Sequence, residues 1–225
     1  MLYFRQILLI LWKDLVTEKR TKESFSQMVT FALLVIVICN VAMQIGTTVQ
    51  DLLPGIIWIA FTFAGILGLN QSFTLERENN SIQGVLLCPV DRSVIYLGKV
   101  IGNFLMMSLT EVILLPAMIV LFNLTVGAYL YRLGVVMMLG TFGFVIIGTL
   151  FASMTAHTRF REMLLPLLVF PIVIPVLIAA VKATGKILAQ KPLAETLFWL
   201  NFLSIFDLIF LGLAMLLFEY IIESD

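Results

Sequence analysis

The stretch LERENNSIQGVLLCPVDRSVIYLGK, residues 75–99, is a polar island in a chain that is otherwise strongly apolar. It is rich in charged side chains, whereas the adjoining runs at 54–75 and 94–122 are almost entirely apolar. A helix needs about 20 mostly apolar residues to cross a membrane. The island therefore indicates a connector that leaves the membrane between two spanning helices, and the rest of the chain fits that interpretation.

The composition of the whole chain also indicates a membrane-embedded fold. Of the 225 residues, 61% are hydrophobic and 12% are charged, which is about half the charged fraction of an ordinary soluble domain. So few charges cannot cover a water-facing surface. We predict an all-α polytopic membrane protein in which residues 1–225 form a single transmembrane domain. Its six spanning helices are expected at 25–45, 54–75, 94–122, 133–154, 163–181 and 198–220.

Proline residues mark two of the predicted spans as irregular. Pro116 lies late in the long third span, which is expected to be tilted or broken there. The fifth span contains Pro166, Pro171 and Pro175, and each of them removes a backbone hydrogen-bond donor. The fifth span is therefore expected to be kinked, or to consist of two half-helices buried in the bundle.

Residues 1–22 predict an amphipathic helix that lies along the membrane surface. Leu8, Leu11, Trp12 and Leu15 recur at helical spacing. Charged residues interrupt the apolar run before it is long enough to span the membrane, and no signal-peptide cleavage site follows it. A helix of this kind buries its apolar face at the boundary between lipid headgroups and acyl chains.

Lysine and arginine residues predict the orientation of the chain, because cytoplasmic loops of membrane proteins are enriched in them. With the N-terminus in the cytoplasm, the cytoplasmic side carries ten of these residues and the outer side carries four. The ten are Arg5, Lys13, Lys19, Arg20, Lys22, Arg77, Arg92, Lys99, Arg159 and Arg161, and the four are Arg132, Lys182, Lys186 and Lys191. Both termini and a loop at 76–92 are therefore expected in the cytoplasm.

The sequence lacks the usual signatures of a hydrolytic, metal or nucleotide site. It has no GxxxxGK[ST] phosphate loop, no HExxH zinc motif and no serine-nucleophile elbow. The single histidine, His157, lies in a predicted loop, and Cys39 and Cys88 are expected at different depths, so no disulfide is predicted. The net charge of zero gives no reason to expect nucleic acid as a partner. We therefore predict no enzyme activity, no catalytic residues and no metal site.

Two ionisable residues fall inside predicted spans. Glu111 lies beyond the middle of the third span, and Asp207 lies near the centre of the sixth. Such residues are costly to place in a membrane and usually face the interior of the bundle. Each is a candidate proton site, substrate contact or, in its protonated form, donor of an interhelical hydrogen bond. The pair Gly98 and Gly102 is a weaker signal, because small residues at this spacing allow helices to approach closely.

The centre of the polar island is apolar, although both of its ends are charged. Val85, Leu86 and Leu87 lie in this centre, and Pro89 then stops a helix. A short helix from about 78 to 87 would lie across the membrane surface with Leu86 and Leu87 on one side. The pattern fits insertion into a groove of a soluble partner, and it fits equally well an interfacial loop whose leucines dip into lipid.

Taken together, these features resemble the membrane subunits of ABC-2 type exporters. Those subunits often carry an ERE–G–L–P–R–GK arrangement after the second span, and the matching residues here are Glu76, Arg77, Glu78, Gly84, Leu86, Pro89, Arg92, Gly98 and Lys99. More narrowly, LLPGIIWIAFTFAGILGLNQSFTLERENNSIQGVLLCPV resembles the CcmB family, the haem exporter permeases of cytochrome c maturation. The hallmark of that family is the PGIIW stretch, here Pro54 to Trp58.

The resemblance implies an ABC-2 exporter-like fold that works with a separate CcmA-like ATPase. The residues that it implies for coupling to the ATPase are Glu76, Arg77, Glu78, Gly84, Leu86, Leu87, Pro89 and Arg92. Further implied partners are CcmC-like and CcmD-like membrane subunits, a CcmE-like haem chaperone and a second copy of the chain, in the bacterial cytoplasmic (inner) membrane. ATP hydrolysis would drive haem export, or release the haem-loaded chaperone outside the cytoplasm. No cofactor is implied on this chain itself, because ATP binds the partner and haem is a candidate cargo.

Three other functions fit parts of the sequence. A general ABC-2 exporter subunit for lipid, drug or glycan would keep the mechanism and change the cargo. An ion-coupled secondary transporter would use Glu111 and Asp207 and would need no ATPase. A structural membrane scaffold would tolerate the loss of ATP hydrolysis by its partners.

Overall fold

A computed structural model of the chain describes residues 2–43, 49–78, 84, 90–124, 127–156, 158 and 160–223, and in these residues it is helical without any strand. The first helix, α1, covers Leu2–Thr21. The long helices are α2 (Glu23–Met43), α3 (Val49–Glu78), α5 (Arg92–Leu121), α6 (Leu130–Thr155), α7 (Arg161–Leu188) and α8 (Leu193–Glu223), and a 3-10 turn, η1, covers Gly127–Tyr129.

The six long helices are long and apolar enough to cross a membrane. The candidate spans are Glu23–Ala42, Asp51–Arg77, Arg92–Leu121, Leu130–Thr155, Arg161–Leu188 and Leu193–Tyr220. Each coincides with one of the six spans predicted from the sequence, and most of the helices extend beyond the predicted ends. The chain is therefore an all-α, multi-pass membrane protein, as predicted.

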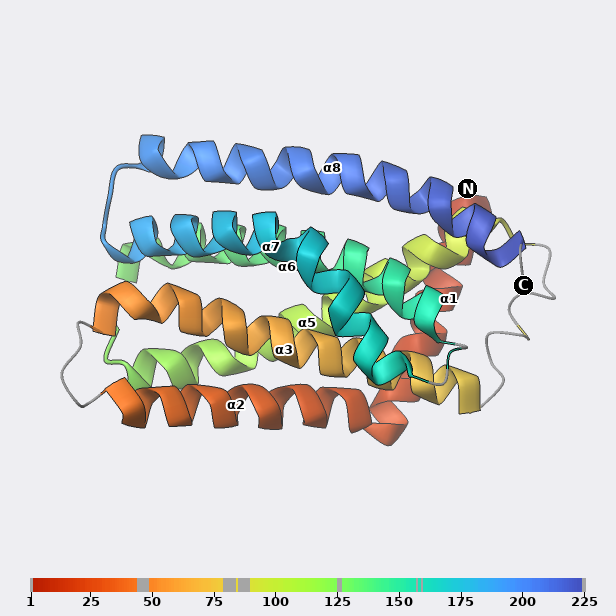
Figure 1. Cartoon of the computed structure of the whole chain (residues 1–225), viewed down its shortest axis with the longest axis horizontal. Helices are drawn as coiled ribbons and strands as arrows, with labels where there is room; N and C mark the ends of the chain where they lie inside the picture. The colour runs from red at the N-terminus through yellow and green to blue at the C-terminus, as the bar shows by residue number, and fades with distance from the viewer. Residues whose placement is uncertain are drawn as a thin grey trace.

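The long helices run side by side along the length of the molecule, whereas α1 runs across them at one end (Figure 1). The same end carries the start of α2, the end of α3, the start of α5, the end of α6, the start of α7 and the end of α8. The last residue of α3 and the first residue of α5, which flank residues 79–91, therefore lie at this end. We call it the α1 end, and the opposite end of the bundle the far end.

The proline-containing helices are continuous. α5 passes through Pro116 without a break, and it runs obliquely past its neighbours, which agrees with a tilted third span (Figure 1). α7 contains all three of its prolines inside one helix that bends near its middle. The kink predicted for the fifth span is therefore confirmed, whereas the alternative of two buried half-helices is wrong. Leu167, Ile174 and Ile178 lie exposed on one face of α7, so only the other face is buried.

Glycine residues allow large side chains of one helix to lie against the backbone of another. The Leu69 side chain of α3 lies against Gly148 of α6, and the Phe144 side chain of α6 lies against Gly65 of α3. A Cβ atom at either glycine would collide with these side chains, so α3 and α6 can pack at this distance only with glycine there.

The turn between α1 and α2 is a single residue long. Lys22 has a φ of 57°, in the left-handed region, and its backbone N–H donates to the carbonyl oxygen of Glu18 at 2.7 Å. The Glu18 carboxylate in turn accepts a hydrogen bond from the backbone N–H of Phe25, at 2.8 Å. An acidic side chain that binds a free N–H in the first turn of a helix stabilises that helix end. The direction of α1 relative to the first span is thereby fixed.

Candidate functional site

Helix α1 packs on α5 through the Gly98–Gly102 pair. A Cβ atom at Gly98 would lie 2.8 Å from Cγ2 of Ile10, and one at Gly102 would lie 3.7 Å from Oδ2 of Asp14. Ile10 and Asp14 are one helical turn apart, as are the two glycines, so the two helices match in register. The glycine pair, a weak signal in the sequence, forms a specific helix interface.

Beside this interface, four charged side chains from three helices form a closed ring. We call it the ionic ring, and its members are Lys13 and Asp14 of α1, Glu76 of α3 and Lys99 of α5. Nζ of Lys13 lies 2.7 Å from Oε1 of Glu76 and 3.0 Å from Oδ1 of Asp14. Nζ of Lys99 lies 3.4 Å from Oδ2 of Asp14 and forms an ion pair with Oε1 of Glu76. The ring has two positive and two negative charges, and it joins α1, α3 and α5.

The ring is largely removed from solvent. Glu76 and Lys99 are each only 6% exposed, and the Lys99 ammonium also lies 5.4 Å from the centroid of the Phe73 ring. Burial of charges is costly, and the loss of one partner of a buried pair leaves an uncompensated charge. The four residues therefore depend on each other, and the three helices are held together at this point.

The two α1 members of the ring have altered acidities. Burial lowers the pKa of Lys13, but the charges of Glu76 and Asp14 outweigh it, and the net pKa lies above the usual value. Burial raises the pKa of Asp14 above its usual value, against the opposing attraction of Lys99 and Lys13. Lys13 is thus firmly cationic, whereas the charge of Asp14 is the more easily lost of the two.

The ionic ring lies at the base of the polar island. Glu76 is in the last turn of α3 and Lys99 is in the second turn of α5, so their ion pair joins the two helices that flank residues 79–91. The Arg77 guanidinium donates to the carbonyl oxygen of Ala156, at the end of α6, over 3.4 Å. The Arg92 guanidinium donates to the carbonyl oxygen of Glu219, near the end of α8, over 3.2 Å.

The predicted coupling residues are placed as follows. Glu76, Arg77 and Glu78 belong to the end of α3, and Arg92 is the first residue of α5, so these four extend the spanning helices. Gly84 is helical and exposed. Leu86, Leu87 and Pro89 lie outside the described residues, as does the Glu78 side chain. Docking of the island on a partner therefore stays a prediction.

The two intramembrane acidic residues differ in their surroundings. Glu111 of α5 is 3% exposed and accepts a hydrogen bond from the hydroxyl of Thr141 on α6. Asp207 of α8 is 4% exposed, lies against Gly143 of α6, and has no hydrogen-bond partner among the described residues. The geometry of Glu111 is that of an interhelical link, whereas Asp207 is a buried carboxyl group without such a link.

The PGIIW stretch lies at the far end of α3. Trp58 is 2% exposed, its indole N–H donates to the hydroxyl of Thr184 on α7 at 3.0 Å, and its ring lies against Gly140 of α6. Pro54 is also buried, and its Cγ would lie 3.5 Å from a Cβ atom at Gly185 of α7. The stretch therefore joins α3, α6 and α7, and the indole of Trp58 is not open to a ligand.

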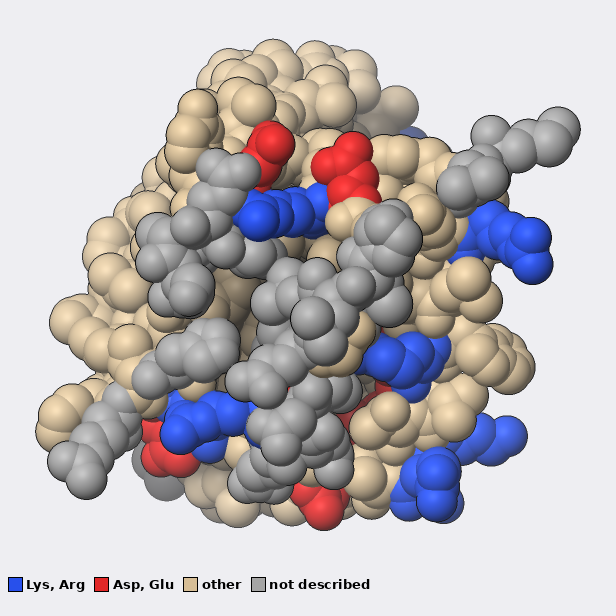
Figure 2. Space-filling model, turned by 90° about the vertical axis from the view of Figure 1, so that its right-hand side faces the viewer, with Lys and Arg blue, Asp and Glu red and all other residues tan. Residues whose placement is uncertain are grey.

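Charged side chains gather at the α1 end. Figure 2 shows this end of the molecule, where Lys and Arg side chains lie at several places and Asp and Glu side chains lie between some of them. Among the described residues, this end includes Arg5, Lys19, Arg20, Lys22, Arg77, Arg92 and Arg161 in addition to the two lysines of the ionic ring. The distribution agrees with the separation of Lys and Arg residues on which the predicted orientation rests.

Sequence reasoning missed the roles of Lys13, Asp14 and Ile10. It treated the charges of α1 as residues that interrupt an apolar run, and it assigned the helix to the lipid surface. The structure confirms the helix and leaves Leu8 and Trp12 exposed, but the opposite face binds α5 and α3. The spacing of Ile10 and Asp14 against that of the two glycines was the available signal.

Comparison with known proteins shows the family to which the chain belongs. The CcmB protein family matches residues 5–218. The heme exporter protein B of Rhodobacter capsulatus is 30% identical over 133 residues, which cover 59% of this chain and 61% of that protein. The heme exporter protein B of Pseudomonas aeruginosa is 29% identical over 185 residues, 81% of each chain. That of Paracoccus denitrificans is 27% identical over 141 residues, 63% of this chain and 64% of that protein, so the chain spans less than two thirds of the Rhodobacter and Paracoccus relatives. Because the family match covers nearly the whole chain, the chain belongs to the CcmB protein family.

Proposed function

We propose that the chain is the membrane subunit of an ATP-driven exporter of cytochrome c biogenesis in the bacterial cytoplasmic membrane. A separate CcmA-like ATPase hydrolyses ATP, and the chain couples this to haem export or to release of a haem-loaded CcmE-like chaperone outside the cytoplasm. The family match and the names of the relatives support this assignment. CcmC-like and CcmD-like subunits and a second copy of the chain are proposed as further partners.

The observation that carries the proposal is the ionic ring at the base of residues 79–91. The Glu76–Lys99 ion pair closes the base, so that a force on the island acts on α3 and α5 as one unit. Lys13 and Asp14 add α1 to the same unit. Packed helices move past each other as rigid elements in many transporters and switches. A partner that binds the island would thus move three helices together.

The α1 end faces the cytoplasm in this proposal. The excess of Lys and Arg at this end supports that orientation, and an ATPase requires cytoplasmic ATP. An impermeant thiol reagent tests the orientation through Cys88, which lies in the island. We expect no labelling of Cys88 on intact spheroplasts and labelling after permeabilisation, and labelling of intact spheroplasts would contradict the orientation.

Coupling is tested with Leu86→Asp combined with Leu87→Asp. If the island inserts its apolar centre into the ATPase, two carboxylates there prevent burial, and the ATPase no longer co-purifies with the chain. Phe160→Asp is the matched control, because Phe160 is an exposed apolar residue at the same end. Co-purification at wild-type yield with the double variant, or equal loss with the control, would contradict docking at 79–89.

The cargo is tested separately from docking. Deletion of the chain is expected to abolish mature c-type cytochromes, and the Leu86→Asp, Leu87→Asp variant is expected to do the same while the chain remains in the membrane. A general exporter of lipid, drug or glycan would leave c-type cytochromes intact. A secondary transporter would move its substrate in liposomes without ATPase, which the proposal excludes.

A further inference from the structure

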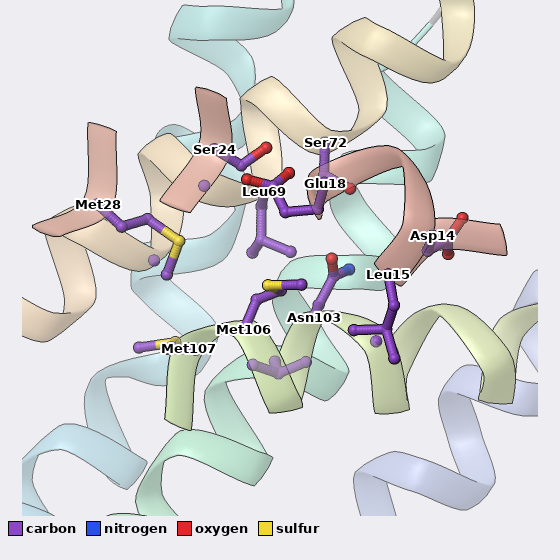
Figure 3. Close-up of a pocket in the computed structure, with 14 residues that line it drawn as sticks. Asp14, Leu15, Glu18, Ser24, Met28, Leu69, Ser72, Asn103, Met106 and Met107 are labelled. Carbon is purple, nitrogen blue, oxygen red and sulfur yellow. The ribbon is translucent and has the colours of Figure 1, made fainter. Parts of the chain in front are cut away.

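The two faces of α1 differ in charge and in what they contact. The helix has two acidic residues, and both lie on its inner face, toward the bundle, where Asp14 belongs to the ionic ring and Glu18 accepts the N–H of Phe25. They line a cavity of about 40 Å³ between α1 and the bundle (Figure 3), which has room for about one or two water molecules. The inner face of α1 is therefore filled by the protein itself.

The outer face of α1 points away from the bundle and is largely apolar. Phe4, Leu8 and Trp12 follow one another at intervals of four residues, so they lie along one side of the helix. Phe4 and Trp12 are each 68% exposed. A shallow groove of about 310 Å³ on this face is lined by Arg5, Leu8, Leu9, Leu11, Trp12 and Leu15. Unlike the inner cavity, this groove lies within the size range of small-molecule sites, roughly 300–1,000 Å³.

Two cationic side chains flank the apolar part of the outer face. Arg5 lies seven residues before Trp12 and Lys19 seven residues after it, so all three lie on the same side of the helix, with about 10 Å between neighbours. Arg5 and Lys19 are exposed, and neither forms an ion pair with a described residue. Because Asp14 and Glu18 lie on the inner face, the outer face combines positive charge with apolar surface.

The outer face lies at the level where the spanning helices leave the membrane. α1 runs across those helices at the α1 end (Figure 1). It contacts the first turns of α5, where the Tyr3 hydroxyl lies 2.6 Å from Oγ of Ser93 and Ile10 packs on Gly98. Tryptophan is enriched at this boundary, and cationic side chains reach from apolar surface into the headgroup region. The occupant that fits the outer face is therefore a lipid.

We propose that the outer face of α1 binds anionic phospholipid, of the phosphatidylglycerol type. An acyl chain lies along the groove beside Leu8 and Trp12, and the phosphate of the headgroup pairs with the guanidinium of Arg5. Lys19 holds a second headgroup of the same kind at the other end of the face. Helices with cationic residues next to an apolar face bind anionic membranes in this way. The inference does not depend on the proposed coupling to an ATPase.

Native mass spectrometry of the full chain, purified in detergent and freed of lipid, tests the preference for anionic lipid. The probes are phosphatidylglycerol and phosphatidylcholine with identical acyl chains. We expect phosphatidylglycerol to be retained about fivefold more than phosphatidylcholine, the effect of one cationic side chain at an anionic surface. The preference is expected to fall as the ionic strength rises, because salt screens exposed charges. Equal retention of the two lipids would overturn the proposal.

A pair of double variants assigns the preference to the outer face. Arg5→Gln combined with Lys19→Gln removes both charges and is expected to remove most of the preference. Lys182→Gln combined with Lys191→Gln is the matched control, because it removes the same charge from two exposed lysines at the far end. The control is expected to keep the preference. Equal loss in both double variants, or no loss in the first, would show that the outer face does not select the lipid.

The contact of the outer face with lipid is tested by fluorescence quenching of the chain in phosphatidylglycerol-containing nanodiscs. Brominated acyl chains quench tryptophan in lipid, whereas acrylamide quenches tryptophan that is open to water. We expect brominated lipid to quench a larger fraction of the wild-type emission than of the Trp12→Phe emission. If acrylamide alone quenches the emission that Trp12→Phe lacks, the outer face contacts water, which would contradict bound lipid and leave the face to a soluble partner.

Discussion

The two ends of α3 are attached to the bundle by different kinds of interaction. At the far end, Trp58 is held by close packing against Gly140 and a neutral hydrogen bond to Thr184. At the α1 end, Glu76 is held by the ammonium groups of Lys13 and Lys99. Close packing allows few alternative arrangements, whereas a buried ion pair holds its helices together only while both partners are present and charged. The attachment of α3 next to the polar island therefore depends on charge, whereas its attachment at the far end depends on shape.

The largest effect is expected from loss of the indole at the far end. Trp58→Ala leaves a cavity between α3, α6 and α7 and an unpaired Thr184 hydroxyl, and we expect it to lower the free energy of unfolding by about 3–5 kcal/mol. Unfolding in detergent micelles measures the change. Trp12→Ala is the control, because Trp12 is 68% exposed. A similar, small loss in both variants would show that the far end is not rigidly packed.

The helices were predictable from the sequence, because long apolar runs can only be spanning helices in lipid. The ionic ring was not predictable from the sequence, because it depends on which face of α1 packs against the bundle. The spacing of Leu8 and Trp12 indicates a helix with an apolar face. Such a spacing does not decide whether that face lies against the protein or against lipid. Glu76 and Lys99 are 23 residues apart in the chain, and only the antiparallel packing of α3 and α5 brings them together.

The next largest effect concerns the centre of the ionic ring. Glu76→Gln leaves two ammonium groups without their shared carboxylate, and we expect a loss of about 1–3 kcal/mol in the free energy of unfolding. Unlike Trp58→Ala, this variant is expected to be rescued in part by a second change, Lys99→Met, which restores charge balance around Lys13 and Asp14. Unfolding measurements on the single and double variants test this.

Glu162→Gln is the matched control for the ring, because Glu162 is exposed at the same end. It is expected to have wild-type stability. If Lys99→Met deepens the loss caused by Glu76→Gln instead of relieving it, the ring is not a balanced unit, and the distinction between the two ends of α3 fails.

A smaller and more local effect is expected where α1 packs on α5. Gly98→Ala places a methyl group 2.8 Å from Ile10, so α1 must shift outward. We expect the free energy that holds α1 on the bundle to fall by about 1 kcal/mol. Backbone hydrogen exchange should then become faster in α1 and stay unchanged in α6. Gly212→Ala in α8 is the control, because open space surrounds that position. Faster exchange throughout the bundle would show that α1 is not a separate attachment.

The smallest effect is a pH dependence at Asp14. Its pKa is raised by burial above the ordinary value of 3.8, so the folded chain holds this proton more tightly than the unfolded chain does. Stability therefore falls as pH rises from about 3.8 through the raised pKa. Asp14→Asn lacks this titration. Wild type should thus lose stability relative to Asp14→Asn as pH rises above 3.8, measured by thermal unfolding in the same detergent. If wild type instead gains stability over Asp14→Asn as pH rises, attraction to Lys99 and Lys13 outweighs the cost of burial, and the charged form of Asp14 stabilises the α1 end.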